Sequence, residues 1–278
     1  MDRDALGDFL RSRRAVISPG EVGLPTLGRR RVPGLRREEV AQLAGVSPDY
    51  YIRLEQGRSR NVSDAVLDAV ARVLRLGTTE REHLFNLARP ASKAAAPPRQ
   101  RIRPGVRLLL DGMERIPAFV LGRRMDVLAW NALGDAVNGF SSWPVPNAAR
   151  HAFLTAAARD LYIEWDAVAA ETVAHLHLDA GRYPGDPLLT AMVGELCAGS
   201  PAFARRWAAQ QVKEKTHGRK LLRHPQAGEL RLTYETLALP GDPDQMLVTY
   251  AAPVGSPTHE RLLILAGTQD ELGRGKAA

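Results

Sequence analysis

Residues 35–57, LRREEVAQLAGVSPDYYIRLEQG, hold the pattern that decides the fold of the N-terminal part of the chain. The apolar residues of Leu35–Ala44 recur on one face of a predicted helix. Gly45 follows at a position where a left-handed backbone often turns the chain. Ser47 then caps a second helix that extends to Gln56 and has proline in its first turn. Two short helices joined by such a turn predict a helix-turn-helix.

Three further helices are predicted around this motif from the spacing of their apolar residues. They cover Asp4–Val16, Ser63–Leu76 and Thr78–Ala88. Together with the two helices of the motif, they give a compact all-α domain of five helices over residues 1–89, with mostly brief loops.

The second helix of the motif is expected to read DNA, because early residues of that helix reach base edges in the major groove. Arg53 is the best candidate for a bidentate contact to guanine. Pro48, Asp49 and Tyr50 point outward on the same helix. Contacts to DNA phosphate are expected from residues at the two ends of the motif. These residues are Arg36, Arg37, Gln56 and Arg58.

A long segment, residues 17–34, separates the first predicted helix from the motif and contains three consecutive arginines, Arg29, Arg30 and Arg31. Two interpretations stay open for this segment. It is either a basic wing that grips DNA phosphate or a solvated loop whose charge is incidental. The first is favoured because the segment adjoins the proposed DNA face.

The positive charge of the chain is concentrated near its N-terminus. Residues 1–103 hold 20 lysines and arginines against 12 aspartates and glutamates, whereas residues 104–278 hold 18 against 19. A nucleic-acid-binding domain joined to a nearly neutral domain gives this distribution. The sequence has no apolar run long enough for a membrane span and begins with a charged segment, so we expect a cytoplasmic protein.

Residues 90–104, PASKAAAPPRQRIRP, interrupt the helical pattern and predict a linker. Beyond it, residues 105–267 predict an α+β domain with a five-stranded antiparallel sheet, and residues 268–278 a flexible tail. Two strands come first, helices follow, and three strands come last, which is the order found in PAS-like domains. The predicted strands are 118–122, 127–130, 220–223, 229–239 and 246–251.

Two resemblances support this organisation. Residues 41–58, AQLAGVSPDYYIRLEQGR, resemble the Xre/Cro-type helix-turn-helix family, whose base-contacting positions fall on Ser47, Pro48, Asp49 and Arg53. Nearly the whole chain resembles the MmyB-like transcription regulators of actinobacteria and relatives. HPQAGEL at residues 224–230 and PGDPDQMLVTY at residues 240–250 carry this second resemblance.

The second resemblance implies a PAS-like domain that binds a small apolar effector, with a fatty acid as one example. Aromatic walls and a few polar groups suit such a ligand, and arginine suits its carboxylate. Homodimers are expected because helix-turn-helix proteins often read paired half-sites. The candidate walls are Phe119, Trp130, Trp165, Trp207 and Tyr250, with Phe153, Leu161 and Phe203 beside them. The candidate polar groups are Asn131, Arg205, Arg206, His217 and Arg219.

An enzymatic function is not favoured. The run His175-Leu176-His177-Leu178-Asp179 suggests a metal site, but residues two apart, such as His175 and His177, point in nearly opposite directions on a helix, so a shared metal is not expected. Cys197 is the only cysteine, which excludes an intrachain disulfide, and no nucleotide, haem or flavin motif indicates a cofactor. Two rival interpretations stay open: a second domain that serves only dimerisation or partner binding, and an enzyme fused to a DNA-binding module.

Overall fold

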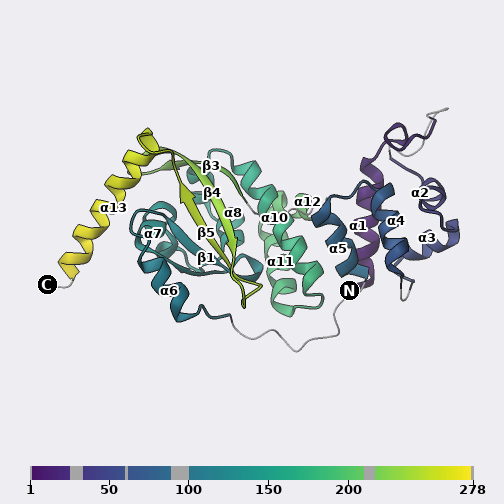
Figure 1. Ribbon diagram of the computed structural model, residues 1–278, viewed down its shortest axis with the longest axis horizontal. Helices are drawn as coiled ribbons and strands as arrows, with labels where there is room; N and C mark the ends of the chain where they lie inside the picture. Colours follow the sequence, from purple (N-terminus) through teal and green to yellow (C-terminus); the bar gives the residue numbers. More distant parts are fainter. Residues whose placement is uncertain (1, 26–33, 60–61, 89–99, 210–216, 277–278) are drawn as a thin grey trace. The chain divides into compact units, whose positions relative to one another are not determined.

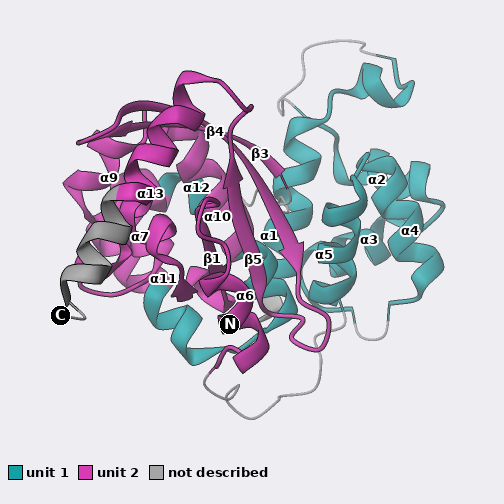
Figure 2. Cartoon of the chain, turned by 60° about the vertical axis from the view of Figure 1, so that its left-hand side comes forward, with its two compact units in different colours: residues 1–97, 177–192, 205–214 teal, residues 98–176, 193–204, 215–278 magenta. Residues whose placement is uncertain are grey.

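The computed structural model describes residues 2–25, 34–59, 62–88, 100–209 and 217–276 (Figure 1). The chain folds into two compact units (Figure 2). The first comprises residues 1–97, 177–192 and 205–214, and the second comprises residues 98–176, 193–204 and 215–278. Two segments that the sequence analysis placed in the second domain therefore belong to the first unit. Within that unit, Leu178 is buried in the same apolar cluster as the N-terminal helices.

The five helices predicted at the N-terminus are confirmed. They are α1 (Asp2–Val16), α2 (Arg37–Ala44), α3 (Pro48–Glu55), α4 (Asp64–Val73) and α5 (Thr78–Ala88). A short 3-10 helix, η1 (Pro19–Val22), occupies part of the long segment between α1 and α2. Residues 26–33 lie outside the described residues and include Arg29, Arg30 and Arg31, so both interpretations of that arginine run stay open.

Helix α2 begins at Arg37, two residues later than predicted. The Leu35 backbone N–H donates to the Arg14 carbonyl at 3.0 Å, so this residue fastens the incoming chain to α1 instead of starting the helix. Gly34 permits this close approach, because a Cβ there would lie 2.2 Å from the same carbonyl oxygen. Leu35 is fully buried, and its side chain joins the core that the helices share.

The turn between α2 and α3 has the predicted geometry. Gly45 adopts φ +70°, and its N–H bonds the carbonyls of Ala41 and Gln42 at the end of α2. Ser47 caps α3, with its hydroxyl accepting from the Tyr50 N–H at 3.2 Å. A serine cap contributes about 1 kcal/mol to helix stability. The backbone of the helix-turn-helix therefore follows from its local sequence.

The second unit contains the predicted five-stranded antiparallel sheet, in the order β2-β1-β5-β4-β3. Burial alternates along β4, where Leu230, Leu232 and Tyr234 are buried and the residues between them are exposed. This alternation confirms the prediction that one face of this strand is exposed to solvent. The strands are β1 (Ala118–Leu121), β2 (Val127–Trp130), β3 (His217–His224), β4 (Gly228–Ala238) and β5 (Met246–Ala251).

Helices precede, interrupt and follow the strands. In chain order they are α6 (Pro104–Asp111), η2 (Arg123–Met125), α7 (Ala132–Asn138), η3 (Phe140–Ser142), α8 (Ala148–Leu154), α9 (Ala156–Leu161), α10 (Trp165–Arg182), α11 (Pro187–Gly199), α12 (Pro201–Ala208) and α13 (Pro257–Lys276). Helix α13 corrects the predicted tail from residue 268, since the helix continues to Lys276. Ser256 starts it by accepting from the His259 N–H at 3.2 Å, a capping signal the sequence analysis missed.

Candidate DNA interface and ligand cavity

Helix α3 has one buried face and one exposed face. Tyr51 and Leu54 are fully buried and fasten the helix to the domain core. Arg53 is exposed, and its guanidinium forms no hydrogen bond or ion pair with the described residues. Because an unpaired guanidinium loses no internal partner on binding, Arg53 is suited to a bidentate contact with a base.

The other predicted DNA-binding residues within the described ranges lie on or beside this face. Tyr50 is half-buried and the others are exposed, namely Arg36, Arg37, Ser47, Pro48, Asp49, Gln56 and Arg58. Gly57 adopts φ +64°, so the chain turns sharply just after α3 and before Arg58. Arg29, Arg30 and Arg31 cannot be placed with them, because they lie outside the described residues.

A buried carboxylate holds the helix-turn-helix together. The Glu55 side chain is fully buried and accepts from Arg14 Nε and Nη2 at 2.9 and 3.0 Å. Arg37 Nε donates to the same carboxylate at 2.9 Å. These bonds link α1, α2 and α3, so Arg37 has a structural role besides its predicted phosphate contact. Its side chain is still 44% exposed, which leaves part of the guanidinium accessible.

The two arginines also control the ionisation of Glu55. Burial alone raises the pKa of this carboxyl group, because it disfavours the charged form. The hydrogen bonds and charges of Arg14 and Arg37 outweigh that effect and hold the pKa below its ordinary value. Glu55 is therefore an ionised structural anchor. The position of Glu55 at the end of α3 could be predicted from the sequence, whereas its two arginine partners could not.

A cavity of about 730 Å³ lies in the second unit. Its lining comes from α7, η3, α8, α9 and the turn between β3 and β4. The volume is within the range of pockets that enclose small molecules. The apolar part of the lining includes Val137, Trp143, Pro144, Ala157 and Leu161. The polar part includes Ser142, His151, Asp160, Arg223 and Gln226.

His151 forms part of the cavity wall and is neutral at physiological pH. Its ring stacks on Trp143 with 3.9 Å between the ring centroids and 8° between the planes. Burial lowers the pKa of His151 to about 4, so this side chain does not supply a positive charge at neutral pH. The wall near Trp143 is therefore aromatic and uncharged.

Arg223 supplies an exposed positive charge at the edge of the cavity. Its cross-strand neighbour Glu229 pairs instead with Arg231, whose Nε lies 2.8 Å from the Glu229 carboxylate. Arg223 forms no ion pair with the described residues. An anionic group at the cavity mouth would therefore meet an available guanidinium.

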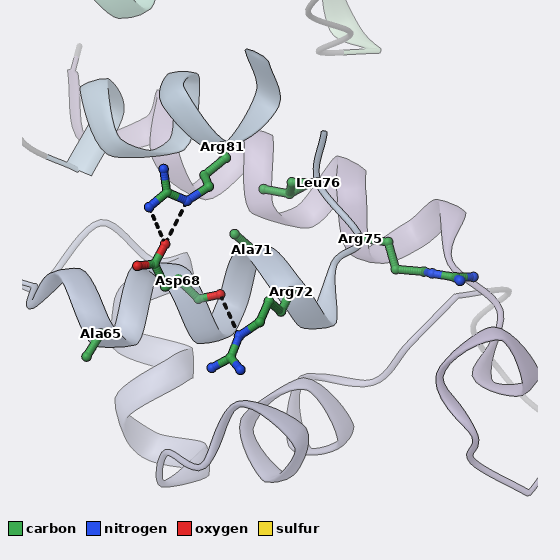
Figure 3. Close-up of a pocket in the computed structure, with 7 residues that line it drawn as sticks. All are labelled: Ala65, Asp68, Ala71, Arg72, Arg75, Leu76 and Arg81. Atoms are coloured by element: carbon green, nitrogen blue, oxygen red, sulfur yellow. Dashed lines mark hydrogen bonds and ion pairs between the residues drawn. The ribbon is translucent and has the colours of Figure 1, made fainter. Parts of the chain in front are cut away.

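A second hollow lies on the first unit between α4 and α5 and is a weaker candidate for a ligand-binding site (Figure 3). Arg81 pairs with the Asp68 carboxylate at 2.6 Å, and Arg72 Nε donates to the Asp68 carbonyl at 3.4 Å. Arg75 points away from both (Figure 3). Because these arginines do not converge, the hollow offers no shared anion site.

Two family models match the chain. The helix-turn-helix domain matches residues 5–84, and the MmyB-like transcription regulator ligand binding domain matches residues 102–266. The chain belongs to the MmyB-like transcription regulators. A comparison with curated proteins found no match. This MmyB-like regulator is thus a DNA-binding transcription regulator with a ligand-binding domain.

Most of the aromatic residues predicted to bind ligand in this MmyB-like regulator lie in the core of the second unit. Phe140 contacts Phe119 and Trp130, with ring centroids 5.0 and 5.4 Å apart, and Phe119 also contacts Tyr250. Trp165 is buried and donates from Nε1 to the Ala152 carbonyl at 2.8 Å. None of these predicted residues is among those that line the 730 Å³ cavity.

The predicted polar contacts are dispersed. Arg205, Arg206 and Trp207 belong to the first unit, where Trp207 stacks on His177 at 3.8 Å. His217 is exposed at the start of β3. Leu161, a candidate wall residue, is among those that line the cavity. Side-chain chemistry identified plausible ligand contacts, but only the fold shows which of them share a space.

The structure gives Asn131 a different role from the predicted ligand contact. Its Oδ1 accepts from the N–H groups of Gly134 and Ala118 at 2.7 and 3.0 Å. Its Nδ2 donates to the carbonyls of Met113 and Ile116 at 2.7 and 2.8 Å. All four bonds go to backbone groups, so Asn131 caps α7 and fixes the chain that leads into β1.

We expect Asn131→Ala to lower the free energy of unfolding of the second unit by about 2–4 kcal/mol, because a cap is lost and buried backbone groups lose their partners. Denaturant-induced unfolding of the full chain, followed by circular dichroism, measures this. Ser141→Ala, at an exposed position nearby, is the control. Equal stability of the two variants would show that the four bonds contribute little.

Clusters of metal-ligating side chains and long apolar helices are both absent from the described part of the chain. There, no three His, Cys, Asp or Glu residues form a group that could hold a metal ion. The same described residues include no helix long and apolar enough to cross a membrane.

Proposed function

We propose that this regulator reads an operator with α3 in the major groove, and that Arg53 makes the principal base contact. The exposure of Arg53 and the absence of an ion pair to it within the described residues support this role. Ser47, Pro48 and Asp49 face the bases at the start of the helix. Arg36, Gln56 and Arg58 position the backbone of the DNA. The regulator acts as a homodimer on paired half-sites.

We further propose that the 730 Å³ cavity binds an apolar small molecule with a polar end, of which a fatty acid is the leading example. The observation that carries this proposal is the cavity itself, with Val137, Trp143 and Leu161 among the residues that line it. Each methylene buried from water contributes about 0.8 kcal/mol, so a hydrocarbon chain would gain substantially there. The ligand changes operator affinity because it binds the two DNA-binding states unequally.

Mass spectrometry of small molecules released from the denatured full-length protein tests the ligand proposal. We expect nearly one equivalent of a fatty acid or similar lipid, either as purified or after exposure to a lipid mixture. Ala157→Trp should abolish this, because the indole would occupy the cavity that Ala157 lines. Ala65→Trp, at the hollow on the first unit, is the matched control. An empty wild-type protein would instead favour a dimerisation or partner-binding role for the second domain.

A further inference from the structure

The wall of the 730 Å³ cavity includes a buried histidine, His151, which is only 6% exposed. Its Nε2 is shielded from solvent and forms no hydrogen bond with any residue that the structure describes. The other histidine of the wall, His224, uses both ring nitrogens in hydrogen bonds to backbone groups. A buried polar atom without a partner costs free energy, so such atoms are rare in folded proteins. In the side chain of a cavity wall, such an atom points to a contact that a ligand completes.

Two other residues of the wall hold the His151 ring in place. Trp143 stacks on one face of the ring, with 3.9 Å between the centroids. Thr155 Oγ1 lies 3.4 Å from His151 Nδ1. Both residues also line the cavity. These contacts fix the ring through its face and through Nδ1, and neither of them uses Nε2.

The hydrogen bonds of Thr155 determine which nitrogen of His151 carries the proton. Burial lowers the pKa of His151 to about 4, so the ring is neutral at physiological pH and has a single N–H. The Thr155 hydroxyl donates its one hydrogen to the His151 carbonyl at 2.8 Å. Towards Nδ1 the same oxygen can therefore only accept, which places the ring proton on Nδ1. Nε2 is then an unprotonated nitrogen that accepts a hydrogen bond and cannot donate one.

The hydroxyl groups of the cavity wall share this preference for accepting. Ser142 Oγ donates its hydrogen to the Gly139 carbonyl at 2.7 Å. The hydrogen of Thr155 is likewise committed to a backbone carbonyl. Only lone pairs remain on these two oxygens, as on His151 Nε2. All three side chains can therefore accept a hydrogen bond from a ligand, and none of them has a hydrogen left to donate to it.

Acceptor groups in an uncharged part of the wall favour a hydroxyl group of the ligand over a carboxylate or an ammonium group. A carboxylate has no hydrogen to donate and would meet the lone pair of His151 Nε2 with its own. An ammonium group can donate, but burying its charge without a countercharge costs far more than burying a hydroxyl. A carboxylate is instead suited to Arg223, which is exposed at the edge of the cavity.

We propose that His151 Nε2 accepts a hydrogen bond from a hydroxyl group of the ligand, which makes His151 a specificity-determining residue for hydroxylated amphiphiles. This inference rests on the proposed ligand-binding function and adds the chemistry of the ligand. The hydrocarbon part of the ligand occupies the apolar part of the cavity, and a carboxylate, where the ligand has one, lies at Arg223. Binding displaces the wall atoms that shield Nε2, and the new hydrogen bond forms without competition from water.

Isothermal titration calorimetry on the full-length protein tests this specificity, with dodecan-1-ol and 1-methoxyundecane as probes. The two molecules are equal in size, but only the alcohol donates a hydrogen bond. In His151→Phe, the ratio of their dissociation constants should shift at least about fivefold in favour of the ether, and using the ratio cancels the difference in hydration between the probes. His259→Phe is the matched control and should keep the wild-type ratio. Both ring nitrogens of His259 also lack partners among the described residues, but His259 does not line the cavity.

Nitrogen-15 NMR of the histidine rings in the wild-type protein tests the same contact without a substitution. We expect His151 Nε2 to resonate as an unprotonated nitrogen at neutral pH. Its signal should move towards the protonated range when the alcohol binds, but not when the ether binds. A proton on Nε2, or an unchanged ratio of dissociation constants in His151→Phe, would overturn the role of His151 while leaving cavity binding intact. If neither probe bound the wild type, the proposed function and this inference would fail together.

Discussion

Glu55→Gln is expected to lower the free energy of unfolding of the helix-turn-helix domain by about 3–5 kcal/mol, because removing one partner of a buried ion pair leaves the other uncompensated. Glu55 is fully buried, and the Arg14 side chain is only 12% exposed. Glutamine keeps the shape but brings an NH₂ group towards two guanidinium groups. Denaturant unfolding of the full-length protein measures the change. Glu38→Gln, at an exposed position on α2, is the control.

The same substitution should change how stability depends on pH. The pKa of Glu55 is lower in the folded protein than its ordinary value, so its contribution is fully present above the unfolded-state pKa of about 4.3. That contribution is lost as the pH falls through the lower, folded-state pKa. Glu55→Gln should therefore flatten the loss of stability in acid. A stability difference from Glu38→Gln of less than about 1 kcal/mol at pH 7 would show that the buried carboxylate is dispensable.

Arg53→Ala is expected to lower operator affinity by about 1–3 kcal/mol, or roughly fivefold to 150-fold, and to relax the choice of base at one position. The side chain is exposed and outside the core, so the domain should keep its stability. Fluorescence anisotropy with a duplex selected from random sequences measures the affinity. A panel of single-base variants of that duplex measures the specificity.

A charge-matched control distinguishes base reading from general electrostatic attraction. Arg115→Ala removes one exposed positive charge from the second unit and should have little effect on operator binding. The salt dependence of binding should change for a lost phosphate contact, whereas a lost base contact mainly changes the sequence preference. Unchanged affinity and preference in Arg53→Ala would remove this residue from the base-reading role.

The helix-turn-helix could be predicted because its determinants are local. The Gly45 turn and the Ser47 cap act within a few residues, and both are in the structure as expected. The bond between Arg14 and Glu55 joins residues 41 positions apart. No short pattern specifies such a pair, since it exists only once three helices have packed together.

The residues that line the cavity are even harder to predict from short sequence patterns than this ion pair. Its lining comes from several helices and one strand turn, and much of it consists of small or polar residues. The predicted wall residues were large aromatics, but two of them, Phe119 and Tyr250, lie in the core, where the Phe119 ring contacts the rings of Tyr250 and Phe140. Apolar character predicts burial, but it does not predict whether the buried space is filled or open.

The central claim is that a ligand in the second domain controls DNA binding by the first, and operator affinity measured with and without hexadecanoic acid tests it most directly. The full-length protein and a duplex selected by it from random sequences are sufficient. The account predicts that saturating acid changes the dissociation constant for this duplex at least about fivefold, and that Ala157→Trp abolishes the effect. Identical operator affinity with the acid demonstrably bound would contradict it.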